Sequence, residues 1–191
     1  MKKIVFDTET RNFFHDVGSN DPAALDLSII CLYDYETGTY HSFLQEELPN
    51  LWPLLERTEM LIGFNSDHFD IPLLNKYYSG NLEKIKSLDI LKEIRKVSGR
   101  RMSLNQVAEA TIGIKKLGKG VQAVHWWNKG DIENLRNYCL EDVKITKEIY
   151  DYARAHNLLK YQEGGVVKEV RLDASKWEEE SDSGLTFSLP F

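Results

Sequence analysis

Two carboxylates, Asp7 and Glu9, lie two residues apart at the end of a short apolar run, residues 4–6. The run is β-branched and aromatic, which predicts a buried strand that begins almost at the first residue. Side chains two apart on a strand point to the same side, so these carboxylates would repel each other unless a cation lies between them. Oxygen ligands of this kind suit a hard divalent cation such as Mg²⁺ or Mn²⁺. The spacing therefore predicts a metal site, and a solvated acidic turn is the alternative for this motif taken alone.

A third acid, Asp142, lies on the apolar face of the strongest predicted helix, residues 132–155. Tyr138, Ile145 and Ile149 share that face, because they follow one another at helical spacing. The face must pack inward, and an acid buried there requires a cation or another partner. Asp142 is therefore a candidate metal ligand, with a solvated place on the helix as the alternative.

Asp70 begins another predicted helix, residues 70–78, and Pro72 falls in its opening turn, where proline is tolerated. An acid in this place is commonly an N-cap. Asn65, however, lies five residues earlier, at the end of a strand predicted at residues 60–64. Asp70 is therefore either a helix cap or a fourth acid of the same site.

These side chains depend on alternating strands and helices for their positions. Further strands are predicted at residues 28–33, 39–43 and 88–90, further helices at 50–57 and 103–111, and a loop at 11–27. The four residues 35–38 end in glycine and predict a hairpin turn between two of the strands. Strands first, then strands that alternate with helices, indicate an α/β layered fold.

Length and composition limit the class of protein. The 191 residues suit one domain with its own core, and a hydrophobic content of 42% is that of a soluble globular protein. No apolar stretch approaches the roughly 20 residues of a membrane span, and the early first strand leaves no room for a secretory leader. Cys31 and Cys139 lack the spacing of a metal-binding pair. They predict reduced core thiols, as expected in the cytoplasm.

Charge is spread unevenly along the chain. The net charge of −6 argues against a large, non-specific nucleic-acid coat, although clustered metal-binding acids would shift it in the same direction. Between residues 84 and 119, ten bases oppose three acids, whereas seven acids face three bases between residues 163 and 182. The basic stretch could follow a phosphate backbone. A solvated helix face explains it equally well on charge alone.

Three motifs follow one another along the chain: Asp7-x-Glu9, Asn65-x-x-x-Phe69-Asp70 and Tyr138-x-x-x-Asp142. Together they resemble the signature of the DEDD 3′–5′ exonucleases. The histidine subtype has His five residues before the last Asp, where this chain has Asn137; the tyrosine subtype has Tyr four residues before it, as here. The chain is thus similar to the DEDDy class, which includes the proofreading domains of family-B DNA polymerases and free-standing relatives. The resemblance covers about residues 1–156, leaves 157–191 as a C-terminal extension, and implies a ribonuclease-H-like three-layer α/β fold.

The resemblance also implies a centre for two divalent cations, Mg²⁺ or Mn²⁺, about 3.5–4 Å apart. Asp7 would bridge both cations. Glu9 and Asp142 would complete the site on the side of the nucleophile, and Asp70 would hold the second cation partly through water. Tyr138 would orient the attacking water, because a phenol is a poor base at neutral pH.

Five further residues match positions through which this family contacts its substrate. Thr10, Asn65 and Phe69 match positions that hold the terminal nucleotides. Ser103 and Leu104 open a motif that touches the strand near its 3′ end. Phe69 and Leu104 would stack on bases or wedge between them, which holds single strands without regard to sequence. Core packing is the alternative for Leu104.

The sequence thus predicts a metal-dependent 3′–5′ exonuclease that acts on single-stranded 3′ ends, with DNA as the favoured substrate. One alternative is an RNA-trimming exonuclease on the same fold, since no motif here reads a 2′-hydroxyl. A nucleic-acid-binding module without turnover is another alternative.

The apolar tail, residues 185–191, carries four large apolar side chains in seven residues, which predicts that it has a partner. That partner is either the protein's own surface, with the tail as an edge strand, or another protein. Residues 186–191 are similar to short peptides by which replication and repair proteins dock on the bacterial sliding clamp. Those peptides usually open with Gln, whereas this chain has Thr186.

Overall fold

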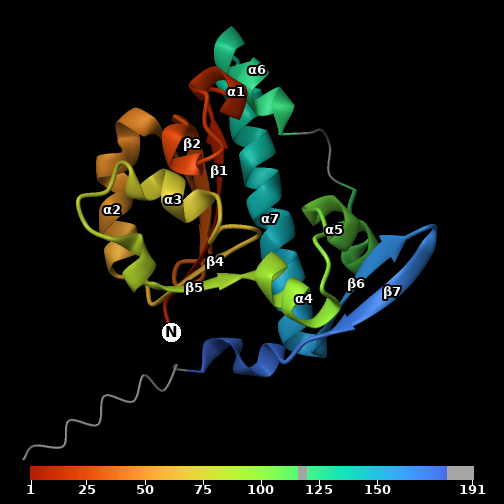
Figure 1. Ribbon diagram of the computed structural model, residues 1–191. Helices are drawn as coiled ribbons and strands as arrows, with labels where there is room; N and C mark the ends of the chain where they lie inside the picture. The colour runs from red at the N-terminus through yellow and green to blue at the C-terminus, as the bar shows by residue number, and fades with distance from the viewer. Residues whose placement is uncertain (116–119, 180–191) are drawn as a thin grey trace, which may run out of the picture.

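The computed structural model describes residues 1–115 and 120–179 (Figure 1). Its central sheet has five strands in the order β3-β2-β1-β4-β5. β1 (Lys3–Thr10) lies in the middle, antiparallel to β2 and parallel to β4. The other strands are β2 (Leu27–Asp34), β3 (Thr39–Leu44), β4 (Met60–Gly63) and β5 (Lys86–Asp89). The strand that carries Asp7 and Glu9 is therefore the centre of the sheet.

Helices cover both faces of this sheet (Figure 1). One face packs against α4 (Ile90–Ser98), α5 (Leu104–Ile112), α6 (Val121–Lys129) and α7 (Ile132–His156), and the other against α2 (Leu48–Glu56) and α3 (Asp70–Asn75). Val5 of β1 belongs to the core under α7, whereas Ile4 and Phe6 belong to the core under α2 and α3. Because side chains alternate along a strand, Asp7 and Glu9 continue the side of Val5 and face α7.

β4 pairs with residues 3–5 of β1 and ends at Gly63. The chain then turns sharply and brings Ser66 close to Gly63. A Cβ atom on Gly63 would lie 2.4 Å from the Cβ atom of Ser66, so this position requires glycine. Asn65 has a φ angle of +67°, a conformation that Asn adopts more readily than most residues. This turn brings the start of α3 beside the carboxyl-terminal half of β1.

After α7, β6 (Leu158–Glu163) and β7 (Val166–Arg171) form a hairpin with a sheet of its own, which packs against α5. A 3₁₀ helix, Ala174–Glu178, follows, and its Trp177 joins the core under α7. The division of the chain at residue 156 stays a prediction. The apolar tail lies outside the described residues, and so do both predictions about what it contacts.

The predicted α/β three-layer fold is confirmed. The loop predicted at residues 11–27 needs correction, because α1 (Phe14–Val17) and a 3₁₀ turn, Pro22–Ala24, form there. The strand predicted at 88–90 runs instead over Lys86–Asp89, and Ile90 begins α4. Within the described ranges, no helix has both the length and the apolarity that crossing a bilayer requires.

Besides α1, two helices of the structure, α4 and α6, were not predicted from the sequence. The signal for α4 was present, since Ile90, Leu91 and Ile94 recur at helical spacing and are buried on one face. α6 buries Ala123 and Val124 and leaves most of its other side chains at least partly accessible to solvent. Its apolar face is narrow, which makes its periodicity weak.

Candidate metal centre

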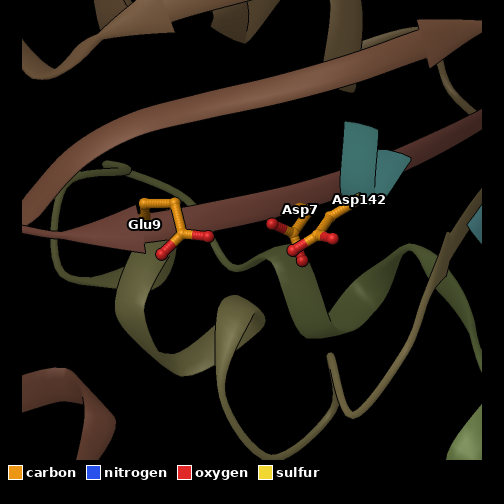
Figure 2. Close-up of side chains that lie close together, drawn as sticks. All are labelled: Asp7, Glu9 and Asp142. Carbon is orange, nitrogen blue, oxygen red and sulfur yellow. The ribbon is translucent and has the colours of Figure 1, made fainter. Parts of the chain in front are cut away.

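The structure brings three of the four predicted acids together. One carboxylate oxygen from each of Asp7, Glu9 and Asp142 lies within 4.8 Å of the others. Figure 2 shows Asp7 and Glu9 on β1 and Asp142 on α7, with the carboxylates of Asp7 and Asp142 close to each other. Asp142 is buried, and the two acids of β1 are half-buried.

α7 holds Asp142 in place through the packing of its neighbours. Leu135, Cys139 and Val143 are fully buried against the sheet, so the adjoining face of the helix points at β1. Tyr138, one turn before Asp142, is also buried, and its ring centroid lies 5.5 Å from that of Trp126 on α6. The apolar stripe predicted for this helix is therefore the surface that presents both Tyr138 and Asp142 to the strand.

The chemistry of this acid cluster fits a hard divalent cation. Its oxygens come from carboxylates alone, the ligand type that Mg²⁺, Mn²⁺ and Ca²⁺ prefer over soft metals. Three like charges so close together raise the free energy of the folded protein, and a bound cation would offset this repulsion. Asp7, Glu9 and Asp142 are therefore the residues that would hold a divalent cation.

Asp70 lies beside this cluster but makes different contacts. Its Oδ1 atom accepts hydrogen bonds from the main-chain N–H of Thr8, at 2.9 Å, and from the hydroxyl of Thr8, at 2.5 Å. These bonds occur where β1 has passed the end of its pairing with β4, so the carboxylate satisfies a strand N–H that would otherwise be orphaned. Burial raises the pKa of Asp70 to about 7, although the hydrogen bonds from Thr8 act in the opposite direction. Asp70 is thus neither a simple N-cap nor a member of the cluster of three.

Sequence reasoning missed Asp89, which organises the loop that carries Asn65. The Asp89 carboxylate accepts hydrogen bonds from the main-chain N–H groups of Asn65, at 2.8 Å, and Asp67, at 3.3 Å. It also caps α4 through the N–H groups of Leu91 and Lys92. Burial raises the pKa of Asp89, and these N–H donors oppose the shift. An Asp placed directly before an amphipathic stretch was the signal that could have revealed it.

Two thiols lie on the core side of Asp7. Cys31 is its cross-strand partner on β2, and Cys139 of α7 has its Sγ atom 3.4 Å from the main-chain oxygen of Asp7 and 3.9 Å from its carboxylate. Both cysteines are buried and free, as the sequence predicted. Burial raises the pKa of the Cys139 thiol, so it contacts Asp7 as a neutral, soft group.

A pocket of about 370 Å³ opens beside Glu9. Thr10 and Phe69, two of the predicted substrate contacts, line it together with Phe13, Phe14 and His15 of the segment around α1. The rings of Phe14 and Phe69 meet edge to face, with centroids 6.2 Å apart. Its volume falls in the range of small-molecule pockets, about 300–1,000 Å³, and aromatic walls next to an acid cluster suit a nucleotide.

Ser103 and Leu104 lie elsewhere, at the start of α5. Ser103 caps that helix in a reciprocal pair with Gln106, and Leu104 packs against the core under α7. In the part of the chain that the structure describes, neither residue lines the pocket beside Glu9. Their predicted substrate contacts stay predictions.

Comparisons with known proteins agree with this architecture. No curated protein matches the chain. Among solved structures, a family B DNA polymerase from the hyperthermophilic archaeon Pyrobaculum calidifontis is similar, with a TM-score of 0.63 and 17% sequence identity. The likeness covers 80% of this chain and 24% of the polymerase chain, so this protein spans about a quarter of that one. At such low identity it shows a shared fold alone. The sequence model of the RNase_H superfamily, however, matches residues 4–154, which is most of the chain, and the chain therefore belongs to the RNase_H superfamily.

Proposed function

We propose that this protein is a metal-dependent 3′–5′ exonuclease that hydrolyses phosphodiester bonds at single-stranded 3′ ends of DNA. The observation that carries the proposal is the gathering of Asp7, Glu9 and Asp142 within 4.8 Å of one another on an RNase_H-superfamily fold. Tyr138 one helical turn before Asp142 supports the assignment to the DEDDy class. The resemblance of the three sequence motifs to those of the proofreading domains of family-B DNA polymerases favours DNA as the substrate.

Each acid has a separate part in the proposed reaction. Asp7, Glu9 and Asp142 hold the cations, Mg²⁺ or Mn²⁺, and Asp70 supplies a fourth carboxylate from the start of α3. Two bound divalent cations would lower the pKa of an attacking water and stabilise the negative charge that develops on the phosphate and leaving oxygens. Burial raises the pKa of Asp70 to about 7, so the protonated fraction of this carboxyl must release its proton before it can bind a cation.

Tyr138 positions the attacking water by a hydrogen bond from its hydroxyl. A phenol is a weak base at neutral pH, so orientation is the role that its chemistry supports. Its ring is held between α6 and α7 by the contact with Trp126, which limits the directions in which the hydroxyl can point.

The terminal nucleotide occupies the pocket beside Glu9. Phe69, Phe13 and Phe14 offer aromatic surfaces there, and stacking on a base is worth about 1–3 kcal/mol whatever the sequence. A base must leave a duplex to stack in this way, which agrees with a single-stranded 3′ end as substrate. Thr10 lines the pocket, and Asn65 lies in the turn before α3; we expect both to contact the sugar and phosphate of the strand end.

Digestion of end-labelled strands tests the proposal. Single-stranded DNA and RNA of matched sequence, labelled at the 5′ or the 3′ end, are incubated with Mg²⁺, Mn²⁺ or EDTA. We expect 5′-labelled DNA to give a ladder of shortening products, 3′-labelled DNA to release a labelled mononucleotide at once, and EDTA to stop both reactions. A circular single strand should stay intact.

Two variants of α7 make the test specific. Asp142→Asn should abolish cleavage, whereas Glu133→Gln, which neutralises an exposed carboxylate on the same helix, should leave it unchanged. Immediate release of a mononucleotide from 5′-labelled DNA would reverse the proposed direction. Faster cleavage of RNA than of DNA would show that RNA, and not DNA, is the preferred substrate. Strand binding without cleavage under every metal condition would favour a binding module.

A further inference from the structure

Two hollows share residues along the outer side of β5. One, of about 490 Å³, is lined by residues of α3, of the segment 83–85 and of β5; the other, of about 320 Å³, lies at the carboxyl end of β5. Asp67 and Lys92 line both hollows, so together they form one groove. β5 is the edge strand of the sheet, and α3 and α4 lie on either side of it (Figure 1).

Four basic side chains line this groove: Lys84, Lys86, Lys92 and Arg95. They are four of the ten bases in the basic stretch of the sequence, whereas Arg100 and Arg101 of the same stretch line a separate pocket beside β6. Lys84, Lys92 and Arg95 are exposed, and the Lys86 ammonium contacts the main-chain oxygen of Glu179.

Two of the three acids in the groove are engaged by the protein itself. Asp67 accepts a hydrogen bond from the hydroxyl of Ser87 and forms an ion pair with Lys92, each at 2.6 Å. Asp89 is buried, and its carboxylate accepts hydrogen bonds from main-chain N–H groups, including those of Asn65 and Leu91. Glu83 is the exposed acid of the set. Lys92 is neutralised by the same ion pair with Asp67, so the other exposed charges of the groove are those of Lys84 and Arg95, opposed by Glu83.

The groove begins at the loop that leads into the metal centre. Asn65 and His68 line the hollow at the carboxyl end of β5. The next two residues along the loop are Phe69, which lines the pocket beside Glu9, and Asp70, which binds Thr8. The loop between β4 and α3 thus lines the basic groove with Asn65 and His68 and the nucleotide pocket with Phe69.

We propose that this groove binds the phosphates of the substrate strand upstream of its 3′ end, while the terminal nucleotide occupies the pocket beside Glu9. The inference rests on the proposed nuclease function and extends it to the rest of the strand. Basic side chains along a groove attract a phosphate backbone without reading its sequence, and the contacts weaken with salt. The groove gives the enzyme a preference for strands long enough to reach from the pocket to β5.

Charge reversal at the two most suitable positions tests the groove. Arg95→Glu and Lys84→Glu change exposed side chains, whereas Lys92 is avoided because it anchors Asp67. The matched control is Lys2→Glu, an exposed residue that pairs with Glu36 at the turn between β2 and β3, on the other side of β1 from β5. All three variants change the net charge by the same amount.

Two readouts separate the groove from the chemistry. Turnover of a p-nitrophenyl ester of thymidine monophosphate reports the metal centre and the pocket beside Glu9, because this substrate has no upstream phosphates to reach the groove. Anisotropy of labelled oligothymidylates of about 4–16 nucleotides, the range of sites on single-strand-binding folds, reports strand binding in EDTA. We expect unchanged ester turnover, about threefold weaker binding of long strands for each lost contact, and a salt dependence whose logarithmic slope falls by about 0.7 per contact.

The groove and the nuclease function would be contradicted by different results. If the groove variants bind every length as tightly as Lys2→Glu does, the groove is overturned, while cleavage by the wild-type enzyme still supports the nuclease. If the wild-type protein turns over neither the ester nor the strands, the proposed nuclease fails. Anisotropy then still judges the groove, because binding in EDTA needs no turnover. Equal weakening for short and long strands would also contradict an upstream site.

Discussion

The two ends of β1 differ in the charges that surround them. At the amino end, Lys3 donates to Glu178 at 2.6 Å and Arg154 approaches the same carboxylate at 3.3 Å. Tyr150 donates to it as well, and the Lys3 ammonium lies 4.6 Å from the centroid of the Tyr35 ring. At the carboxyl end, Asp7, Glu9 and Asp142 bring three acids within 4.8 Å of one another. One end mixes opposite charges, and the other collects like charges.

The pKa values of acids near the two ends follow the same division. Burial alone would raise the pKa of Glu178, but the hydrogen bonds from Lys3 and Tyr150 and the charges of Lys3 and Arg154 lower it on balance. Burial raises the pKa of Asp70 to about 7 in spite of its hydrogen bonds. The acid at the amino end therefore stabilises the fold when it is ionised, whereas Asp70 near the carboxyl end lowers stability when it is ionised, because it is buried. That cost is what prepares the site for metal.

The largest expected effect comes from Asp7→Ala. Removing an acid shared by both proposed cations should lower cleavage of single-stranded DNA to below about a hundredth of wild type, a loss at least as large as that of one key electrostatic contact. In EDTA the variant should melt at the same temperature as wild type or higher, because like-charge repulsion is relieved. Cleavage assays and thermal melts measure both effects. Substantial cleavage by a folded variant would remove Asp7 from the centre.

Tyr138→Phe should come next. Loss of the hydroxyl that orients the water should lower the turnover number roughly tenfold to a thousandfold, the range for a single positioned group. Mn²⁺ affinity, measured by calorimetry, should stay close to wild type, because the tyrosine is not a proposed ligand. An unchanged turnover number would show that Tyr138 acts in packing alone.

Asp70→Asn tests the cost at the carboxyl end through pH. Because the folded pKa of about 7 lies above the ordinary value of 3.8, the unfolded chain ionises first and the folded state loses stability as pH rises between these values. In EDTA, the variant should therefore melt above wild type at about pH 8, by roughly 2–4 °C per kcal/mol relieved, and by less at about pH 5. A gain that is equal at both pH values would contradict this account.

Glu178→Gln tests the amino end and should give the smallest effect. Its lowered pKa means that its contribution is present above the unfolded value near 4.5 and is lost as pH falls through the folded one. At neutral pH we expect a melting temperature lower by about 2–4 °C, the effect of about 1 kcal/mol, with cleavage per folded molecule unchanged. Asp173→Asn, which breaks the exposed pair with Lys176, is the control and should change little. A fall in activity per folded molecule would mean that the two ends are coupled.

The sequence was sufficient for the acids whose positions follow from periodicity. Asp7 and Glu9 share a face because a strand repeats every two residues, and Asp142 points at them because it lies on the apolar stripe of a helix. Local patterns of this kind also placed the central strands and α7. The α/β class followed from their order along the chain.

Long-range geometry decided what the sequence could not show. Asp70 binds Thr8 because β4 stops pairing partway along β1, and no local pattern reports where a neighbouring strand ends. Asp89 holds the Asn65 loop through bonds that span more than twenty residues of chain. The bases of this stretch could be counted in the sequence, but the alignment of four of them along β5 depends on how η3 (Leu82–Lys84), β5 and α4 follow one another at the edge of the sheet.

The division of the acid cluster between β1 and α7 also has a consequence for biosynthesis. A ribosome makes β1 first, and the helix that carries Asp142 emerges only after most of the domain. Until α7 docks across the sheet, Asp7 and Glu9 lack the third carboxylate of the cluster, and an emerging chain holds an incomplete centre. The proposed nuclease activity would therefore begin only when folding is nearly complete.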